Sequence, residues 1–452
     1  MLRPIANFIK IYSSKLSTNL HRVKLTLSLF VSVSRIVIAT KLLPKPRKIK
    51  VSTTTATNFV IVASDFLPTI HGGIYRPASW LRFASAQTCK LQLLTNTPKR
   101  RSNIGESLLT DWAINDQVHY CNESQFDVIS TPARWCMTRP EFFLAALAHL
   151  EKLHQQQAFS HIIATGPDFT SFIIAAVFAR RHRLHLHLDY RDEWTLSPFD
   201  FSEPTPLSRC LEQAAIKQAD SISMTTQSQL DYFHQHFNFL GVTLLKPNGC
   251  DQFPQLAQVQ NRSLEPLVIC HSGNVGGHNS LTALISYFNQ LDELIQGSGH
   301  SIRLAFCGAI AENQQQLLAS SSALSLSLLG QMTPEQAFTH TINADICLLL
   351  VDERYQRYLP GKLFGYIASG KPILIFGADN CIEISTICEK YGVPHFFANL
   401  FANGAVNNMS ACAEFLKNCR QLRTDESRLE EFRCTMDRQS LAKDFFESFK
   451  LD

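Results

Sequence analysis

The sequence predicts an α/β protein that contains two doubly wound parallel sheets. From Asn58 onward, short apolar runs typical of buried strands alternate with longer helical segments. This alternation stops at residues 246–266, which are rich in Pro, Asn and Gln, and then begins again. Strands that alternate with helices are joined by crossover connections, which give parallel sheets covered on both faces. The length of 452 residues accommodates two such domains with sizeable cores.

The first half follows this pattern from its first strand. Phe59-Val-Ile-Val-Ala-Ser64 is a continuous apolar run, as expected for a strand buried on both faces. The other expected strands are 91–94, 162–165, 184–188, 221–224 and 242–245, and the expected helices are 142–154, 169–180, 207–219 and 227–237.

The second half restarts with a strand at 267–271. Further strands are expected at 302–307, 324–329, 345–351 and 372–376, and helices at 280–294, 313–319, 334–341, from Lys362, at 381–391, 410–422 and 427–449. The expected organisation is an N-terminal arm at 1–56, a first domain at 57–250, a linker at 251–266, a second domain at 267–425 and a C-terminal helix at 426–452.

The N-terminal arm differs from the rest of the chain in charge. Residues 1–64 carry eleven Lys and Arg and no Asp or Glu, although the whole chain has a net charge of only +4. Spacing at about 100° per residue places one set of apolar residues on a single helix face: Ile5, Phe8, Ile9, Tyr12, Leu16, Leu20, Val23, Leu27, Phe30 and Val31. This pattern predicts that residues 1–50 attach to a membrane surface. A helix packed on the body and a targeting segment are the alternatives.

Other classes of protein fit the sequence less well. The apolar run 25–40 is interrupted by Arg35 and is shorter than the ~20 residues of a spanning helix. The apolar stripe of the arm lacks spaced stacking residues, so we expect no nucleic-acid partner. Thirteen cysteines without a CxxC pair or zinc spacing indicate reduced thiols and no metal site. His185 and His187 alternate with Leu in a strand, which favours packing over metal binding.

The segment Lys362–Gly377 is the most informative part of the second half. It reads as a short helix, a glycine stop and a buried strand, and a loop with Arg354, Arg357 and Pro360 precedes it. Ligands of parallel α/β sheets bind where strand ends meet helix N-termini, so Lys362 is placed to meet a phosphate.

Two further connections of the second half are candidates for the same ligand. Ser272-Gly-Asn-Val-Gly-Gly277 lies between a strand and a helix, where glycines let backbone N–H groups approach an anion. Leu329-Gly-Gln-Met-Thr-Pro334 joins a strand to a capped helix. The alternative for both is an ordinary turn.

Two segments of the first half follow strands and carry polar side chains. Leu67-Pro-Thr-Ile-His-Gly-Gly-Ile-Tyr-Arg76 contains two glycines, with His71 and Arg76 as polar candidates. Asp189-Tyr-Arg-Asp-Glu-Trp194 places charged residues directly after an apolar strand, where they point into the crevice of such sheets. A surface loop and an internal Arg–Asp pair are the respective alternatives.

Together these segments resemble the glycosyltransferases of the GT-B fold, GT4 type. That family often reads Pro-x-Lys-Leu-Phe/Tyr-Glu-Tyr-x-Ala-x-Gly-Lys-Pro, and it also shows Ser-Gly-Asn-x-Gly, Pro-Asn-Gly-x-Asp and Asp-Phe-Arg-Asp-Pro-Trp segments. The resemblance implies two Rossmann-like domains facing a cleft, with the C-terminal helix returning to the first domain. It also implies a nucleotide-diphosphate sugar as substrate, a glycan or lipid-linked acceptor, retention at the anomeric carbon, and no metal or other cofactor.

The resemblance assigns roles to residues of this chain. Donor-binding positions would be Ser272, Gly273, Asn274, Gly276, Gly330, Gln331, Met332, Lys362, Leu363 and Gly365. Catalytic positions would be His71, Arg191 and Asp192, and the acceptor loop would use Gly72, Gly73 and Arg76. Gly365 stands where the family usually has the Glu that holds the donor ribose. The implied setting is the cytoplasmic face of a cell membrane, in polysaccharide or glycolipid synthesis.

Two other functions remain open from the sequence. A nucleotide-sugar epimerase also uses two Rossmann-like halves, but it needs acid and base groups beside the sugar. A catalytically degenerate scaffold that binds a partner is the other, since Gly365 replaces a ligand of the family.

Overall fold

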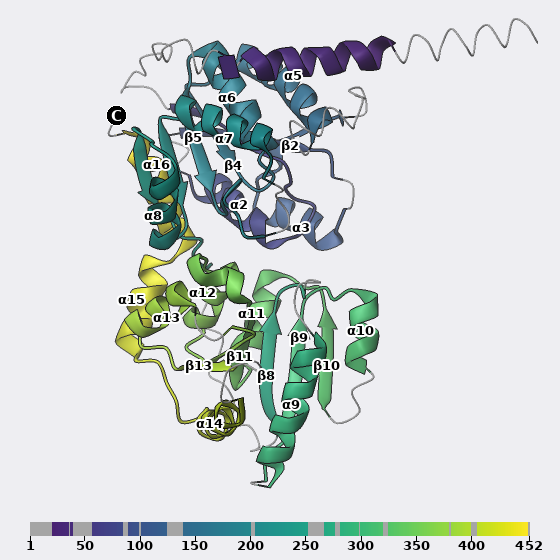
Figure 1. Ribbon diagram of the computed structural model, residues 1–452, viewed down its shortest axis with the longest axis vertical. Coiled ribbons are helices and arrows are strands. Elements are labelled where there is room, and N and C mark those ends of the chain that lie inside the picture. Colours follow the sequence, from purple (N-terminus) through teal and green to yellow (C-terminus); the bar gives the residue numbers. More distant parts are fainter. Residues whose placement is uncertain are drawn as a thin grey trace, which may run out of the picture. The chain divides into compact units, whose positions relative to one another are not determined.

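The computed structural model describes most of the chain. The described residues are 20–35, 37–38, 57–84, 89–98, 101–123, 139–199, 204–251, 266–275, 281–297, 299–319, 324–378, 381–398 and 405–450. The chain divides into two compact units (Figure 1). The first comprises Met1–Thr225, Leu230–Lys246 and Phe445–Asp452, and the second comprises Thr226–Gln229 and Pro247–Asp444.

The first unit contains a seven-stranded parallel sheet in the order β3-β2-β1-β4-β5-β6-β7. Its strands are β1 (Thr57–Ala63), β2 (Cys89–Asn96), β3 (Val118–Cys121), β4 (His161–Thr165), β5 (His185–Tyr190), β6 (Ser221–Met224) and β7 (Val242–Leu245). Its helices are α2 (Tyr75–Phe83), α3 (Asn103–Asp111), α5 (Pro140–Gln156), α6 (Thr170–His182), α7 (Pro206–Gln218) and most of α8 (Gln227–His236). Strand β4 is buried along its whole length, as its continuous apolar run requires.

The second unit contains a six-stranded parallel sheet in the order β10-β9-β8-β11-β12-β13. Its strands are β8 (Leu267–Ser272), β9 (Ile302–Cys307), β10 (Ser325–Gly330), β11 (Ile346–Leu350), β12 (Ile373–Phe376) and β13 (His395–Ala398). Its helices are α9 (Leu281–Gln296), α10 (Glu312–Ala319), α11 (Pro334–Ile342), α12 (Gly361–Ala368), α13 (Ile382–Lys390), α14 (Ala405–Asn418), α15 (Glu426–Thr435) and most of α16 (Arg438–Glu447). The prediction of two parallel-sheet α/β domains is confirmed.

The structure adds elements that the sequence pattern does not reveal. These are α2, α3, β3 and β13, which are short or carry many polar residues. The predicted helix 427–449 is wrong as one element, because it ends at Thr435 and restarts at Arg438. At the break, Cys250 N–H donates to Met436 O (2.8 Å) and Arg438 N–H donates to Cys250 O (2.9 Å). The chain leaves the helix there to pair with the segment after β7.

The C-terminal residues pack within the first unit. The ring of Phe445 stacks on Trp80 with centroids 4.5 Å apart, and Phe446 meets Phe59 edge to face at 5.2 Å. Aromatic contacts of this kind contribute about 0.5–1.5 kcal/mol each beyond the area that they bury. They attach the end of α16 to the sheet that contains β1.

Each sheet has one topological switch point, where successive connections diverge to opposite sides. In the first unit it lies between β1 and β4, and in the second between β8 and β11. Loops that leave the carboxyl ends of these strands surround a crevice, which is the usual ligand site of open α/β sheets. The predicted segments after β1, β8 and β11 are three of these loops.

Residues 20–35 and 37–38 are helical and belong to the first unit. Leu29 and Val33 are buried in its core, and Leu25, Phe30 and Val37 pack against that core. Phe30, predicted on the same face as Val31, therefore faces the body of the protein. Residues 1–19, 36 and 39–56 of the predicted arm and 252–265 of the linker lie outside the described residues. Within the described part, no helix has the length and apolar content that crossing a bilayer requires.

Candidate functional site

In the second unit, Lys362 and His271 meet at the β8/β11 switch point. Lys362 lies in the first turn of α12, and His271 is a fully buried residue near the end of β8. His271 Nδ1–H donates to Leu348 O (3.0 Å), which leaves Nε2 to accept from Lys362 Nζ (3.1 Å). Burial lowers the pKa of His271 well below its usual value, so the ring is neutral and accepts this bond. Burial also lowers the pKa of Lys362 to about 8.

The loop after β8 lies directly beside this lysine. A Cβ built on Gly273 would lie 3.4 Å from Lys362 Nζ, and Gly273 has a φ of +116°. Ser272 N–H donates to Tyr366 Oη (2.7 Å), which fixes the loop to α12. Asn274 Oδ1 accepts from Ala309 N–H (3.0 Å) and so joins the loops after β8 and β9. Asn274 therefore stabilises the conformation of the loop after β8.

Helix α12 presents an uncapped N-terminus at the same place. Its N-cap residue is Pro360, and no side chain caps its first turn. The backbone N–H groups of an uncapped first turn carry partial positive charge and bind anions. One ammonium group and one helix N-terminus thus converge at the switch point, which is a combination suited to a phosphate.

The remaining predicted donor positions have different surroundings. Leu363 is fully buried in the core under α12, so its side chain has a packing role. Gly330 ends the edge strand β10, Gln331 follows it, and both are exposed. Met332 packs against the small cluster formed by Cys270, Ala305, Cys307 and Ala344. Gly365 lies within α12, and no heavy atom would come within 4 Å of a Cβ placed there. Gly276 lies outside the described residues.

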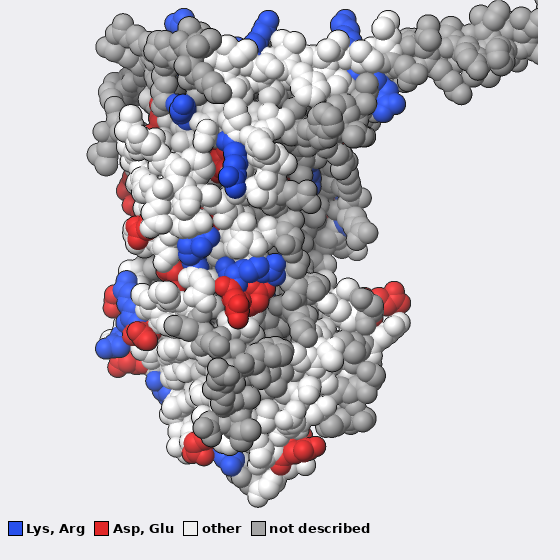
Figure 2. All heavy atoms as spheres, in the orientation of Figure 1, with Lys and Arg blue, Asp and Glu red and all other residues white. Residues whose placement is uncertain are grey.

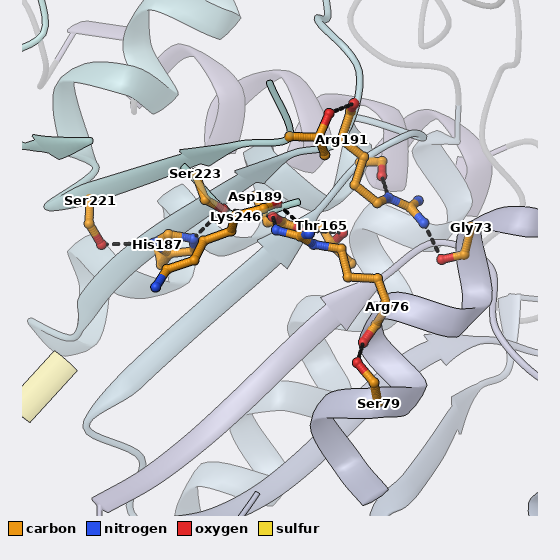
Figure 3. Close-up of polar contacts among 12 residues, drawn as sticks. Gly73, Arg76, Ser79, Thr165, His187, Asp189, Arg191, Ser221, Ser223 and Lys246 are labelled. Carbon is orange, nitrogen blue, oxygen red and sulfur yellow. Dashed lines mark hydrogen bonds and ion pairs between the residues drawn. The ribbon is translucent and has the colours of Figure 1, made fainter. Parts of the chain in front are cut away.

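In the first unit, Asp189 at the end of β5 binds Arg76 of α2 (Figure 3). Arg76 donates from Nε and Nη2 to the two carboxylate oxygens, at 3.0 and 2.7 Å, and from Nη1 to Lys246 O at 2.7 Å. Thr165 and Ser223 hydroxyls donate to the same carboxylate, at 2.8 and 2.6 Å. Both charged groups are almost completely buried. The guanidinium of Arg76, predicted to face an acceptor, is thus used inside the protein.

Arg191 joins the loops that follow β1 and β4. Its guanidinium donates to the carbonyl oxygens of Gly73 and Gly166, and to Pro167 O at 3.4 Å. The contact between Arg191 and Gly73 is visible beside the Arg76–Asp189 pair in Figure 3. Arg191 therefore fixes the loop that contains Gly72 and Gly73, called the glycine loop below, at the β1/β4 switch point. Asp192 is half-buried, and burial raises the pKa of its carboxyl group.

His71 lies in the same loop, and one of its two ring nitrogens is hydrogen-bonded within that loop. Gly73 N–H donates to His71 Nδ1 (3.1 Å), so the ring proton lies on Nε2. Nε2 is inaccessible to solvent and finds no hydrogen-bond partner among the described residues. Burial, assisted by the nearby charge of Arg191, lowers the pKa of His71 to about 4. At neutral pH, His71 is a neutral hydrogen-bond donor at Nε2.

Both ring nitrogens of His187 contact hydroxyl groups of the neighbouring strand, so this side chain has a structural role in the sheet. Ser221 Oγ lies 2.8 Å from Nδ1, and Nε2 lies 2.9 Å from Ser223 Oγ. Burial lowers its pKa to about 3, so it is neutral. The rings of His185 and His161 stack at 4.8 Å. Among the described residues, no group of three or more His, Cys, Asp or Glu is arranged to hold a metal ion.

Sequence reasoning missed His271, Tyr366 and the Arg76–Asp189 pair. A signal for His271 exists, because it is a polar residue in the apolar strand 267–271 immediately before the Ser-Gly-Asn segment. The other two have no local signal, since Tyr366 contacts Ser272 across 94 residues and Arg76 contacts Asp189 across 113.

Known proteins resemble this chain in structure rather than in sequence. No family model matches it, and no curated protein matches it by sequence. Sucrose-phosphate synthase from Thermosynechococcus elongatus superposes with a TM-score of 0.63 at 12% identity, covering 87% of this chain and 98% of the other. A trehalose-6-phosphate protein from E. coli bound with UDP-2-fluoro glucose gives 0.53 at 11%, covering 87% and 99%.

An epimerase also has this architecture. A UDP-N-acetylglucosamine 2-epimerase superposes with a TM-score of 0.52 at 10% identity, covering 88% of this chain and 94% of the other. At these identities the likeness concerns the fold alone. With its two doubly wound parallel-sheet units, the chain has the GT-B fold.

Proposed function

We propose that this protein is a GT4-like glycosyltransferase of the hexosyltransferase type. It would move a sugar, with retention at the anomeric carbon, from a nucleotide-diphosphate sugar to a glycan or lipid-linked acceptor. The setting would be polysaccharide or glycolipid synthesis at the cytoplasmic face of a membrane. The observation that carries the proposal is the Lys362 ammonium beside Gly273 at the N-terminus of α12.

The second unit would hold the donor through its diphosphate. As the bond between the anomeric carbon and the phosphate oxygen breaks, the electron pair leaves with the diphosphate. An acceptor hydroxyl oxygen bonds to the anomeric carbon on the same face and gives its proton to the departing phosphate. The Lys362 ammonium and the N–H groups of α12 offset this growing charge, and His271 holds the ammonium in place. Because the protein supplies this positive charge itself, the proposal needs no resident metal or cofactor.

The first unit would hold the reacting sugar or the acceptor through the loops after β1 and β4. His71 is neutral and accepts a hydrogen bond from Gly73 N–H, so it would shape the loop that faces the sugar or the acceptor. Arg191 would act by positioning the glycine loop, since its guanidinium binds Gly73 O and Gly166 O. Asp192 adds a half-buried carboxylate next to it.

An epimerase is the second candidate, because epimerases share this fold. The test is to incubate the protein with UDP-, GDP- and ADP-sugars, with and without a mixture of glycan and lipid-linked acceptors. A transferase releases nucleoside diphosphate at a rate that rises with acceptor and yields a glycosylated product. Conversion of the donor into an isomeric nucleotide sugar without acceptor would instead establish an epimerase and refute the proposal.

Introducing Glu at Gly365 is expected to tighten donor binding. The position has open space around its Cβ direction, so the side chain fits. A carboxylate that accepts hydrogen bonds from the donor ribose would improve nucleotide affinity about tenfold, as measured by calorimetry with UDP, GDP and ADP. Replacing a helical glycine also stabilises the helix by about 0.5–1 kcal/mol. Gly365→Ala is the matched control, because it should raise the melting temperature without improving affinity. Equal affinities of the Glu and Ala variants would contradict the ribose contact.

Donor affinity is expected to fall as pH rises through about 8. Above the lowered pKa of Lys362, about 8, the ammonium loses its proton and its attraction for the diphosphate. Affinity for a nucleoside diphosphate should therefore be about tenfold weaker at pH 9 than at pH 7. Lys362→Arg keeps its charge over this range and should give a flat profile in the same calorimetric titrations. An equally steep fall in that variant would assign the effect to another group.

A further inference from the structure

The helical residues 20–35 and 37–38 have a second apolar face that the rest of the described chain leaves exposed. Its inner face is buried, with Thr26, Leu29 and Val33 at 6%, 0% and 4% exposure. Its outer face carries five large apolar side chains that remain 41–72% exposed: Leu20, Val23, Leu27, Val31 and Ile38. We call these five residues the outer stripe. Side chains spaced by three, four and seven residues lie along one side of a helix, so the outer stripe forms a continuous line.

The surroundings of the outer stripe are basic. Lys24 and Arg35 are exposed and follow stripe residues Val23 and Val31 by one and four positions. No acidic residue occurs in the first 64 positions of the chain, against eleven Lys and Arg. Figure 2 shows Lys and Arg, and no Asp or Glu, along the edge of the first unit where this helix runs in Figure 1. An apolar line with cationic side chains beside it complements the acyl and headgroup regions of an anionic bilayer.

The contacts that the inner face of the helix makes with the core fix the position of the outer stripe. Leu29 and Val33 belong to the same core cluster as residues of α5 and α6. The helix is thus fixed parallel to the surface of the first unit with its outer side chains already ordered. A preformed surface does not lose the conformational entropy of folding when it binds.

We propose that the outer stripe is a docking surface for an anionic lipid bilayer, with Leu27 and Val31 near its centre. The helix would lie in the plane of the headgroups and hold the first unit against the membrane. This surface does not depend on the proposed transfer reaction, because it involves none of the residues at either switch point.

Vesicle co-sedimentation of the full chain tests the proposal. The probes are vesicles of phosphatidylcholine alone and vesicles with one third phosphatidylglycerol, in the absence of any nucleotide or acceptor. We expect binding only to the anionic vesicles. The double variant Leu27→Ser/Val31→Ser should weaken it by at least about tenfold. Lys24→Gln/Arg35→Gln should weaken it by several fold and reduce its salt dependence, because the other basic residues of the arm remain.

Leu240→Ser is the matched control, because Leu240 is 91% exposed in the same unit but far from this helix in sequence. It should bind vesicles as the wild type does. Wild-type binding by the Leu27→Ser/Val31→Ser variant with unchanged circular dichroism would overturn the proposal. So would self-association of the wild type, abolished in that variant, without any binding to vesicles, because the stripe would then be an interface between two copies of the chain. Vesicle binding is read without nucleotide, so it can succeed or fail independently of sugar transfer.

Discussion

Replacing Lys362 by Ala is expected to reduce the proposed sugar transfer by about a hundredfold to a thousandfold. The ammonium is the charged group beside Gly273 and the first turn of α12, and removal of one preorganised donor to a developing anion typically has an effect of this size. Affinity for the nucleoside diphosphate should fall with it, because the bound product carries the same phosphates. Initial rates with the best donor from the substrate survey and calorimetry with its nucleoside diphosphate measure both effects.

Two controls separate this effect from unfolding. Lys390→Ala removes an exposed lysine of the same unit, at the end of α13, and should leave activity and binding unchanged. The melting temperature of Lys362→Ala should stay close to that of the wild type, because the substitution removes a partly desolvated charge and leaves the neutral His271 behind. Full activity in a folded Lys362→Ala protein would disprove the donor site.

Replacing Asp189 by Asn is expected to destabilise the first unit by about 3–5 kcal/mol. The substitution leaves the buried guanidinium of Arg76 without its counter-charge, and breaking a buried ion pair from one side has an effect of this size. This is a large part of the 5–15 kcal/mol that stabilises a typical domain. All four tryptophans lie between residues 80 and 194, so urea unfolding followed by tryptophan fluorescence reports on this unit.

An exposed ion pair of the same unit provides the comparison. Glu106→Gln breaks the contact with Arg101. The side chain of Glu106 is 44% exposed and that of Arg101 is 64% exposed, so the substitution should change the free energy of unfolding by at most about 1 kcal/mol. A similarly small effect for Asp189→Asn would show that the Arg76 pair contributes little to the stability of the fold.

The same pair should make the first unit sensitive to acid. Burial opposes ionisation of Asp189, but the charge and hydrogen bonds of Arg76, with the Ser223 hydroxyl, hold its pKa below the usual value. A depressed pKa contributes stability that is complete above the pKa of the unfolded chain, ~4, and is lost as pH falls through the lower folded value. Unfolding free energy of the wild type should therefore decrease below about pH 4, and Asp189→Asn should show less of this decrease.

Local patterns were sufficient for much of the fold and for the position of the glycine-containing loop after β8. The strand 345–351 and the glycine stop before 372–376 follow from apolar runs and from Gly370, whose φ of +68° favours a glycine. The segment after β8 was found because its glycines and its place after a strand are visible in sequence. Short polar helices such as α3 were not found, because their hydrophobic period extends over too few residues to be distinguished from a loop.

The two faces of the N-terminal helix show a limit of periodicity. A helical wheel identifies apolar positions, but Leu29 and Val31 are equally apolar, and only packing decides that one is buried and the other is exposed. In the same way, the sequence places the charged residues Arg76, Arg191 and Lys362 near strand ends, but it does not show which partner each of them binds.

The sequence by itself determined the alternation of strands and helices, the two sheets and the glycine loops, because these depend on neighbours a few residues apart. The tertiary structure decided which charges remain available to a ligand. Arg76 is neutralised by Asp189, 113 residues away, whereas Lys362 is held by a neutral His271, 91 residues away, and keeps its charge for an anion. Such partners meet only through the order and register of the parallel strands, which no local pattern encodes.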